Sequence, residues 1–340
     1  MDTAERIAKM VMEYKKELEE MPVQDNQISR EEFTLLLSGI STCRKAPGIP
    51  VHMGYQELYH CTDAGEAEKT REHLERMYGI HDEESFQEAC RAEYSGSRQY
   101  EQFMTFWSGA PMFDINELNG QGRQYFEECI SLSHHFYPIL REKGYYAWDI
   151  NEKIGLLRKA AACGIVSDER FWELTDPWVR QAQVFYHSWQ EYAVSCLCGA
   201  VYFMSRHAEV DESFYNLNYN LVRHLFEEGG AWQRNGWYKP KEREWADLLG
   251  DHPGCIITKR AADSGEIGYM YREEPVEGFP DCGWRFFVGD EPEDYVNQAE
   301  NNTIISFNTV CNLDPTIMAY FYAEAGRKFG KTPDGWEEEF

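Results

Sequence analysis

The chain lacks the features of a membrane protein and is poor in positive charge. No stretch approaches the ~18 apolar residues of a membrane span, and Met1 to Glu5 contains no basic region followed by an apolar run. Lysine and arginine total 33 against 59 aspartates and glutamates, a formal net charge of −26. Such a chain repels nucleic-acid phosphates and anionic lipid head groups. We therefore expect a cytoplasmic protein with no nucleic-acid and no membrane partner, whose acidity serves solubility or attracts a basic protein surface.

The sequence also lacks the usual signatures of catalysis and of metal binding. It contains no GxSxG, GxxxxGK[ST], GxGxxG or HExxH motif. Ten cysteines form no CxxC pair, so we expect reduced, buried thiols. The pair His134-His135 is typical of a helix surface, and the acidic run 290–294 lacks the spacing of an EF-hand loop. We expect no metal, no cofactor and no catalytic residue.

The length and a change of periodicity predict two domains. Apolar residues recur at helical spacing over residues 1–250, and they give way to short β-rich runs after the turn Asp251 to Gly254. The first segment is predicted to be an all-helical domain. The second, 254–340, is predicted to be a small α+β domain, so the fold class is multi-domain and the two parts should be separable.

Capping signals divide the helical segment. Ser29 with Glu32 has the form of a capping box, Gly164 fits a left-handed helix stop, and Ser167 is placed to start the next helix. A second capping box is expected at Asp149 with Glu152. The pair Asp176-Pro177 is expected to open a long helix that continues to about Ala200.

Four strands and one helix are predicted in the second segment. The strands are expected at 255–258, 267–272, 283–288 and 304–310, and Asp314-Pro315 is expected to open a helix. The acidic end, Glu337 to Glu339, is expected to be a tail.

The helical segment resembles a bacterial family known as domain of unknown function 1266. The similarity lies in scattered positions over about residues 115–250, and they are Trp148-Asp149, Arg158, Gly164-Ile165-Val166, Ser167, Trp172, Ser188-Trp189, Glu191 and Gly199. Ile165 departs from the aromatic residue that the family more often has there. The family has no established chemistry, so the resemblance implies a fold and no activity.

The second segment resembles a small bacterial family among the immunity proteins of polymorphic toxin systems, also known as domain of unknown function 2185. Ordered blocks carry the similarity, and they are Gly268 to Pro275, Asp281 to Phe287, Gly289 to Glu291, Asn308 to Val310 and Asp314-Pro315. Cys282 departs from the serine that is common in the family, and residues 326–329 differ as well. The resemblance implies a protein that binds and neutralises a toxin.

Two interpretations are open for the blocks of the second segment that carry this resemblance. Strand alternation places Tyr269, Tyr271 and Glu273 on one face, with Met270, Arg272 and Glu274 on the other. Either the arginines pair with acidic residues inside the domain, or an exposed aromatic and arginine patch contacts a partner. The candidate partner-binding residues are Tyr271, Arg272, Glu273, Asp281, Trp284, Arg285, Asp290, Glu291 and Asp314.

The helical segment has its own candidates, for which packing and ligand contact are both open. These candidate ligand-contact residues are Trp148, Asp149, Arg158, Trp172 and Trp189. The leading functional hypothesis is a non-enzymatic immunity-type protein with a protein partner, for which a basic toxin domain such as a nuclease would suit the acidity. The alternatives are an enzyme of unknown reaction with its site in the helical domain, and a regulatory or scaffolding protein.

Overall fold

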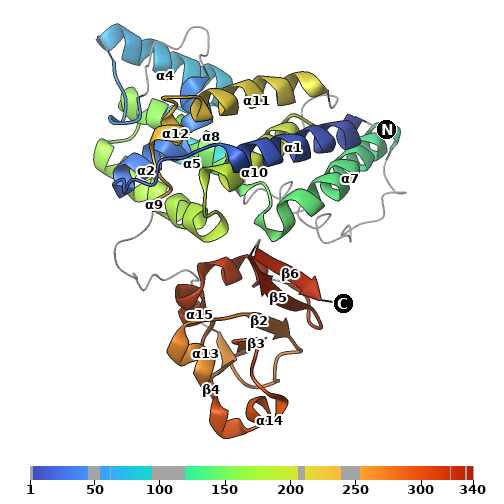
Figure 1. Ribbon diagram of the computed structural model, residues 1–340. Coiled ribbons are helices and arrows are strands. Elements are labelled where there is room, and N and C mark those ends of the chain that lie inside the picture. Colours follow the sequence, from blue (N-terminus) through green and yellow to red (C-terminus); the bar gives the residue numbers. More distant parts are fainter. Residues whose placement is uncertain are drawn as a thin grey trace. The chain divides into compact units, whose positions relative to one another are not determined.

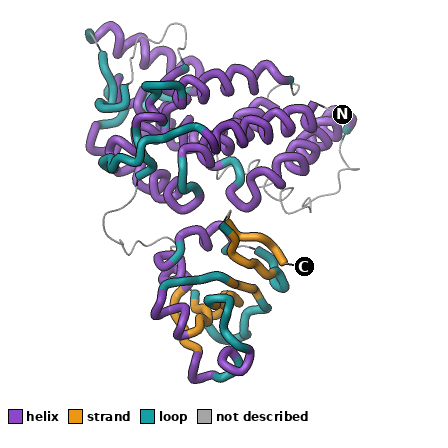
Figure 2. The backbone as a smooth tube through the Cα atoms, in the orientation of Figure 1, coloured by secondary structure: helices purple, strands orange, loops and turns teal. Residues whose placement is uncertain are grey.

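The computed structural model describes residues 3–44, 54–61, 63–93, 119–205, 211–238, 253–321, 323–333 and 335–339. The chain divides into two compact units, Met1–Lys239 and Pro240–Phe340. Helices make up the first unit, and every strand of the described residues lies in the second (Figure 1, Figure 2). This confirms the predicted fold class. The boundary that we placed at 250–254 stays a prediction, because residues 239–252 lie outside the described part of the chain.

The first unit is a bundle of helices. Its described elements are α1 (Thr3–Glu20), α2 (Arg30–Leu37), α3 (Gly39–Cys43), α4 (Ala64–Tyr78), α5 (Glu83–Glu93), α7 (Gly120–Leu140), the 3₁₀ turn η2 (Arg141–Lys143), α8 (Tyr146–Ala162), α9 (Asp168–Phe185), α10 (Trp189–Ser205), α11 (Glu212–Phe226) and α12 (Ala231–Arg234). Helix α10 lies at the centre and contacts α1, α7, α8 and α11 (Figure 1). Helices α8 and α10 are buried on nearly all sides, which explains why neither shows a polar face.

Small residues allow the two central helices to meet. A Cβ atom built on Gly199 of α10 would lie 2.4 Å from the Cβ atom of Trp148 on α8, closer than real Cβ contacts come. Gly155 of α8 has the same role against Ser41, whose hydroxyl oxygen would lie 2.0 Å from such an atom. A glycine of one helix therefore lets the side chain of its neighbour pack directly against the helix backbone.

Several predicted helix ends are confirmed. Ser29 and Glu32 form a reciprocal capping box at the start of α2. Ser167 caps α9 through the amide of Arg170, and Gly164 has a φ of 72°, the left-handed conformation expected of a stop.

Two predicted helix starts are wrong. Asp149 does not cap a helix, because α8 begins earlier and encloses it as a buried residue. Pro177 does not open a helix either, since α9 runs through it from Asp168 to Phe185. The predicted long helix also ends at Phe185, and α10 begins anew at Trp189, after an extended Tyr186.

The second unit contains a six-stranded mixed sheet. Its elements are β1 (Gly254–Thr258), α13 (Lys259–Ser264), β2 (Tyr269–Arg272), β3 (Asp281–Phe287), α14 (Glu293–Val296), η3 (Ala299–Asn301), β4 (Asn302–Ser306), α15 (Phe307–Leu313), η4 (Pro315–Tyr320), β5 (Lys328–Thr332) and β6 (Gly335–Glu339). The strand order is β4-β1-β3-β2-β5-β6, and only β1 and β3 run parallel.

One face of this sheet packs on the core of the unit. The core residues come from the strands and from α13, α15 and η4, and include Cys255, Ile257, Ala261, Met270, Trp284, Phe286, Phe307, Val310, Ile317 and Phe329. The unit is therefore a two-layer structure, with short helices over one side of the sheet.

The structure corrects the predicted strands in two places. The fourth strand ends at Ser306, because that residue caps α15 through the amide of Thr309 and Phe307 turns inward as a helical core residue. The acidic end is not a tail. It forms β6, which pairs antiparallel with β5 and buries Trp336.

Within the described residues, no helix combines the length and the apolarity that crossing a membrane would require.

Replacing Gly199 with alanine should reduce the thermal stability of the chain. The added methyl group would collide with Trp148 in a packed core, which costs about 1–3 kcal/mol. The matched control is Gly120→Ala in α7, where a Cβ atom meets nothing within 4 Å. Thermal unfolding followed by circular dichroism checks this; equal melting temperatures for the two variants would show that α8 and α10 are not in close contact.

Candidate partner-binding site

The second face of the C-terminal sheet gathers residues from all six strands. Strand register aligns a single row across it, from β4 to β6, and this row is Ile304, Ile256, Arg285, Tyr271, Lys328 and Glu339. A neighbouring row contains Phe287, Tyr269, Gly330 and Glu337. None of the apolar residues in these rows belongs to the core cluster of the unit. We call the two rows the second face.

Aromatic side chains occupy the middle of the second face. The rings of Tyr271 and Phe287 stack with centroids 5.6 Å apart and an interplanar angle of 11°, and Tyr269 lies 6.0 Å from Phe287. Ile304 at one edge is 76% exposed. Burial and the nearby carboxylate of Glu273 raise the pKa of Tyr271, so its hydroxyl stays neutral at physiological pH.

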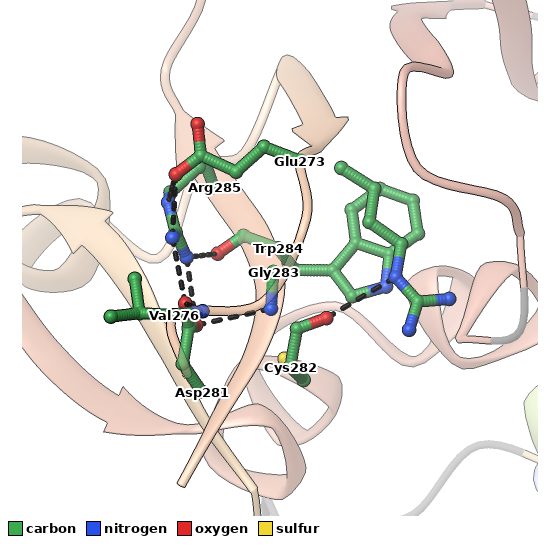
Figure 3. Close-up of polar contacts among 8 residues, drawn as sticks. Glu273, Val276, Asp281, Cys282, Gly283, Trp284 and Arg285 are labelled. Carbon is green, nitrogen blue, oxygen red and sulfur yellow. Dashed lines mark hydrogen bonds and ion pairs between the residues drawn. The ribbon is translucent and has the colours of Figure 1, made fainter. Parts of the chain in front are cut away.

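A buried ion pair lies within this face. The Arg285 guanidinium donates two hydrogen bonds to Asp281, Nη1 to Oδ1 at 2.9 Å and Nη2 to Oδ2 at 2.8 Å (Figure 3). Its Nε donates to Oε1 of Glu273 at 2.7 Å, and Nη1 also donates to the carbonyl oxygen of Trp284 at 2.9 Å. The Arg285 side chain is only 4% exposed. This is the first of the two interpretations left open above: the arginine pairs within the domain.

Asp281 also organises the chain around it. Its Oδ1 accepts from the amide of Gly283 at 3.0 Å and its Oδ2 from the amide of Val276 at 3.1 Å (Figure 3). Gly283 has a φ of 82°, and a Cβ atom there would lie 2.1 Å from the carbonyl oxygen of Glu273. Only glycine fits this position, where the loop returns to the sheet.

The hydrogen bonds from Arg285 and from two amides lower the pKa of Asp281 to about 2. The same hydrogen bonds raise the pKa of the Arg285 guanidinium above its usual value. Both groups are charged at every physiological pH.

The loop between β2 and β3 carries exposed apolar side chains. Phe279 is 72% exposed and Val276 is 50% exposed. The loop starts from Glu273 and ends at Asp281, so both of its ends are held by Arg285. Sequence reasoning did not single out these two side chains. They could have been found from the sequence as two apolar residues in a segment of glutamate, glycine and proline that lacks the periodicity of a strand or a helix.

Two of the predicted contact residues lie on the core side of the sheet. Trp284 is fully buried and stacks on Phe286 at 5.9 Å, so it is not part of an exposed aromatic patch, the second interpretation left open above. Arg272 donates to the carbonyl oxygens of Cys282, Phe321 and Ala323. Both residues tie the sheet to the segment after η4.

The remaining acidic candidates differ in their accessibility. Glu291 accepts hydrogen bonds from the Thr258 hydroxyl and from two backbone amides. Asp314 caps η4, and its Oδ2 forms an ion pair with Lys331 Nζ at 2.6 Å. These two hold turns. Asp290 is exposed and pairs with Arg260 at 3.0 Å. The accessible members of the predicted set are therefore Tyr271, Glu273 and Asp290.

In the helical unit, Arg158 is a fully buried cation that donates hydrogen bonds to uncharged acceptors. It donates to the hydroxyls of Ser38 and Thr42, each at 3.0 Å, and to three backbone carbonyls between Gly54 and Leu58. Desolvation lowers the pKa of Arg158, but the guanidinium stays protonated at neutral pH. These bonds fix the segment 54–58 against α2, α3 and α8.

The other candidates of the helical unit also take part in packing. Trp189 stacks on Trp232 at 5.2 Å, and its Nε1 donates to the carbonyl oxygen of Asn235 at 2.8 Å. Trp148 and Asp149 are buried within α8, and the partly buried Trp172 contacts Phe171 edge to face. Packing accounts for these contacts, and ligand contact at these positions stays a prediction. Among the described residues, no cluster of three or more His, Cys, Asp or Glu is placed to hold a metal ion.

Fold and site together define a two-domain protein, with a helical first unit and a small α+β second unit that presents an aromatic and acidic sheet face. Residues 255–339 match the family model of the immunity protein Imm33 domain, and residues 73–237 match the model of a protein of unknown function, DUF1266. No curated protein and no solved structure matches the chain.

These matches confirm most of the expected resemblance and correct one part of it. The resemblance of the helical segment to DUF1266 is confirmed, with a match that starts earlier than the predicted residue 115. The C-terminal match is to the Imm33 domain, so the assignment to domain of unknown function 2185 is wrong. The immunity-type class that we expected for this domain is confirmed.

Asp281 should stabilise the C-terminal unit above about pH 4 and lose that effect in acid. Its pKa is depressed to about 2 in the folded chain from an ordinary value near 3.9, so its contribution is complete above the unfolded pKa and is lost as the pH falls through about 2. We expect Asp281→Asn to lower the free energy of unfolding by roughly 2–3 kcal/mol at pH 7, and the difference from the parent to shrink between pH 5 and 2.

The matched control is Asp290→Asn, which removes a surface ion pair and should cost less than about 1 kcal/mol. Urea unfolding of the full chain at several pH values measures both variants. If Asp281→Asn lowers the free energy of unfolding no more than Asp290→Asn does, or lowers it equally at every pH, the assigned role of the ion pair is contradicted.

Proposed function

We propose that this chain is a non-enzymatic binding protein of the immunity type, which neutralises a bacterial toxin domain by covering it with the C-terminal unit. The observation that carries the proposal is the match of residues 255–339 to an immunity protein domain. The geometry supports it: the same residues form a sheet face with stacked aromatic rings at its centre, and Lys328, Glu337 and Glu339 lie beside them.

The make-up of this face suits a protein partner. Tyrosine and other aromatic side chains are enriched at the centres of protein interfaces, and polar groups surround them. Tyr271 and Glu273 would contact the partner directly, while Asp281 and Arg285 position them. Trp284, Arg272, Glu291 and Asp314 would act through the fold, since their side chains hold strands and turns.

The charge of the unit favours a basic target. Residues 254–340 carry 7 lysines and arginines against 17 aspartates and glutamates, a formal charge of 7 − 17 = −10. A basic toxin domain, such as a nuclease, would be attracted by this field, whereas nucleic acid and anionic membranes would be repelled. The proposal therefore places the chain in the cytoplasm with a protein partner and no cofactor.

The helical unit contributes no catalytic step in this proposal. Its buried polar candidates are engaged in packing, and Arg158 is already surrounded by five acceptors from the protein. An enzyme of unknown reaction would instead need a pocket with converging histidine, cysteine or carboxylate groups.

Growth rescue tests the proposal. The full chain is purified from its native host, and each protein that co-purifies is expressed alone in a susceptible strain. We expect one of them to arrest growth, and co-expression of the full chain to restore it. The control is Tyr271→Ser together with Glu273→Lys, which should rescue poorly because the centre and the rim of the face are altered. If no co-purifying protein is toxic, or if the parent chain fails to rescue growth, the proposal is overturned.

Association with this toxin domain should depend on salt. Raising the ionic strength from 0.1 to 1 M shortens the Debye length from roughly 10 Å to roughly 3 Å, so the on-rate should fall while the off-rate changes less. Surface plasmon resonance over a salt series measures both rates. The variant neutralises Asp290, Glu293 and Asp294 and keeps Glu291, because Glu291 holds the turn at Val288. An on-rate that is insensitive to salt, and equal in this variant, would refute electrostatic steering.

A further inference from the structure

The β2–β3 loop, Glu273 to Asp281, combines exposed apolar side chains with a backbone that several hydrogen bonds hold in place. Val276 and Phe279 are 50% and 72% exposed, and with Ile304 they are the large exposed hydrophobic residues of the described C-terminal unit. The apolar surface of these two side chains is left in water in the free chain, so a partner that covered it would gain the free energy of its burial.

Hydrogen bonds fix the loop at both ends and at its tip. The Val276 amide donates to Asp281 Oδ2 at 3.1 Å, the Phe279 amide to the Val276 carbonyl at 3.3 Å, and the Asp281 amide to the Phe279 carbonyl at 2.8 Å. Beyond the loop, the Gly254 amide in β1 donates to the carbonyl oxygen of Pro280 at 2.5 Å. The exposed side chains are thus held on an ordered backbone.

This order rests on the ion pair already described. Arg285 is bonded to Glu273 at the first residue of the loop and to Asp281 at the last (Figure 3). A side chain that is held in its bound position before association loses less conformational entropy on binding. A buried ion pair that supports an exposed Phe279 is the arrangement expected of a preorganised interface anchor.

The charges beside the anchor indicate what surrounds it in the complex. Residues 273–281 contain Glu273, Glu274, Glu277 and Asp281 and no lysine or arginine. Arg285, which is bonded to Glu273 and Asp281 at the two ends of the loop, is itself buried. Glu274 and Glu277, on either side of Val276, are exposed and add negative charge next to the apolar tip.

We infer that this loop is the anchor by which the chain holds its toxin, with Phe279 and Val276 inserted into an apolar pocket that lysines or arginines border. The inference rests on the proposed function and adds to it the contact surface and the chemistry of the complementary site. Apolar insertion sets the lifetime of the complex, and the flanking glutamates select a partner with a cationic rim.

The test uses the full chain and, as the probe, the purified toxin domain that growth rescue identifies. Phe279→Ala should weaken binding at least about tenfold, mainly by faster dissociation, since anchor residues dominate the off-rate. Glu274→Gln with Glu277→Gln should mainly slow association. The matched control is Met77→Ala, which truncates a side chain of the helical unit that is 59% exposed and should leave affinity unchanged. Because Phe279 and Met77 are both exposed, neither truncation should change the melting temperature.

The outcomes separate the two proposals. If the parent rescues growth and Phe279→Ala binds as tightly as the parent, the anchor is wrong and the immunity function stands. If the parent fails to rescue growth, the immunity function itself fails, and the anchor with it. Hydrogen exchange of the free full chain checks preorganisation without any partner. The amides of Val276, Phe279 and Asp281 should exchange more slowly than in an unstructured peptide. Exchange at the rate of such a peptide would show that the loop is not preorganised and would overturn the inference.

Discussion

The bidentate ion pair between Arg285 and Asp281 fixes the part of the C-terminal unit to which we assign partner binding. It joins the two ends of the β2–β3 loop, holds Glu273 beside Tyr271 and sets the return of the chain into β3 at Gly283. In a site that excludes water, removing either charge leaves the other without compensation, and the cost exceeds that of a surface pair. The position of Glu273 beside the aromatic face and the shape of the exposed loop therefore both depend on one buried contact.

The helical unit uses a buried guanidinium in a similar way, with different acceptors. Arg158 bonds to hydroxyls and backbone carbonyls and thereby attaches the segment 54–58 to the bundle. Arginine suits both positions because its planar fork can donate to several acceptors at fixed angles, which a lysine cannot do. Each unit thus contains a cation that stabilises an irregular segment from within. In the C-terminal unit that segment presents Phe279, and in the helical unit it is part of the packing.

Most of the residues proposed as contacts from sequence turned out to support the surface. Blocks rich in arginine, aspartate and tryptophan look similar whether they form an interface or hold a domain together, because both uses need charge pairs and large rings. Strand alternation separated Tyr271 from Met270 and Arg272, as the register and the core show, and the bond from Arg285 places Glu273 on the side of Tyr271. It could not show that Trp284 is covered by the segment after η4, since that contact joins residues 37 positions apart.

The sequence by itself determined the elements that depend on neighbouring residues. Periodicity separated a helical part from a β-rich part, and short-range caps such as Ser29 and Ser167 were found because their hydrogen bonds span three residues. Where a local signal competed with packing, packing prevailed, as when α9 continued through Pro177 and when β6 formed from an acidic stretch by pairing with β5. Only the tertiary structure decided which charges are buried, which aromatic rings reach the surface and which loop is held in an exposed position. Those properties arise from contacts between segments that are distant in the chain.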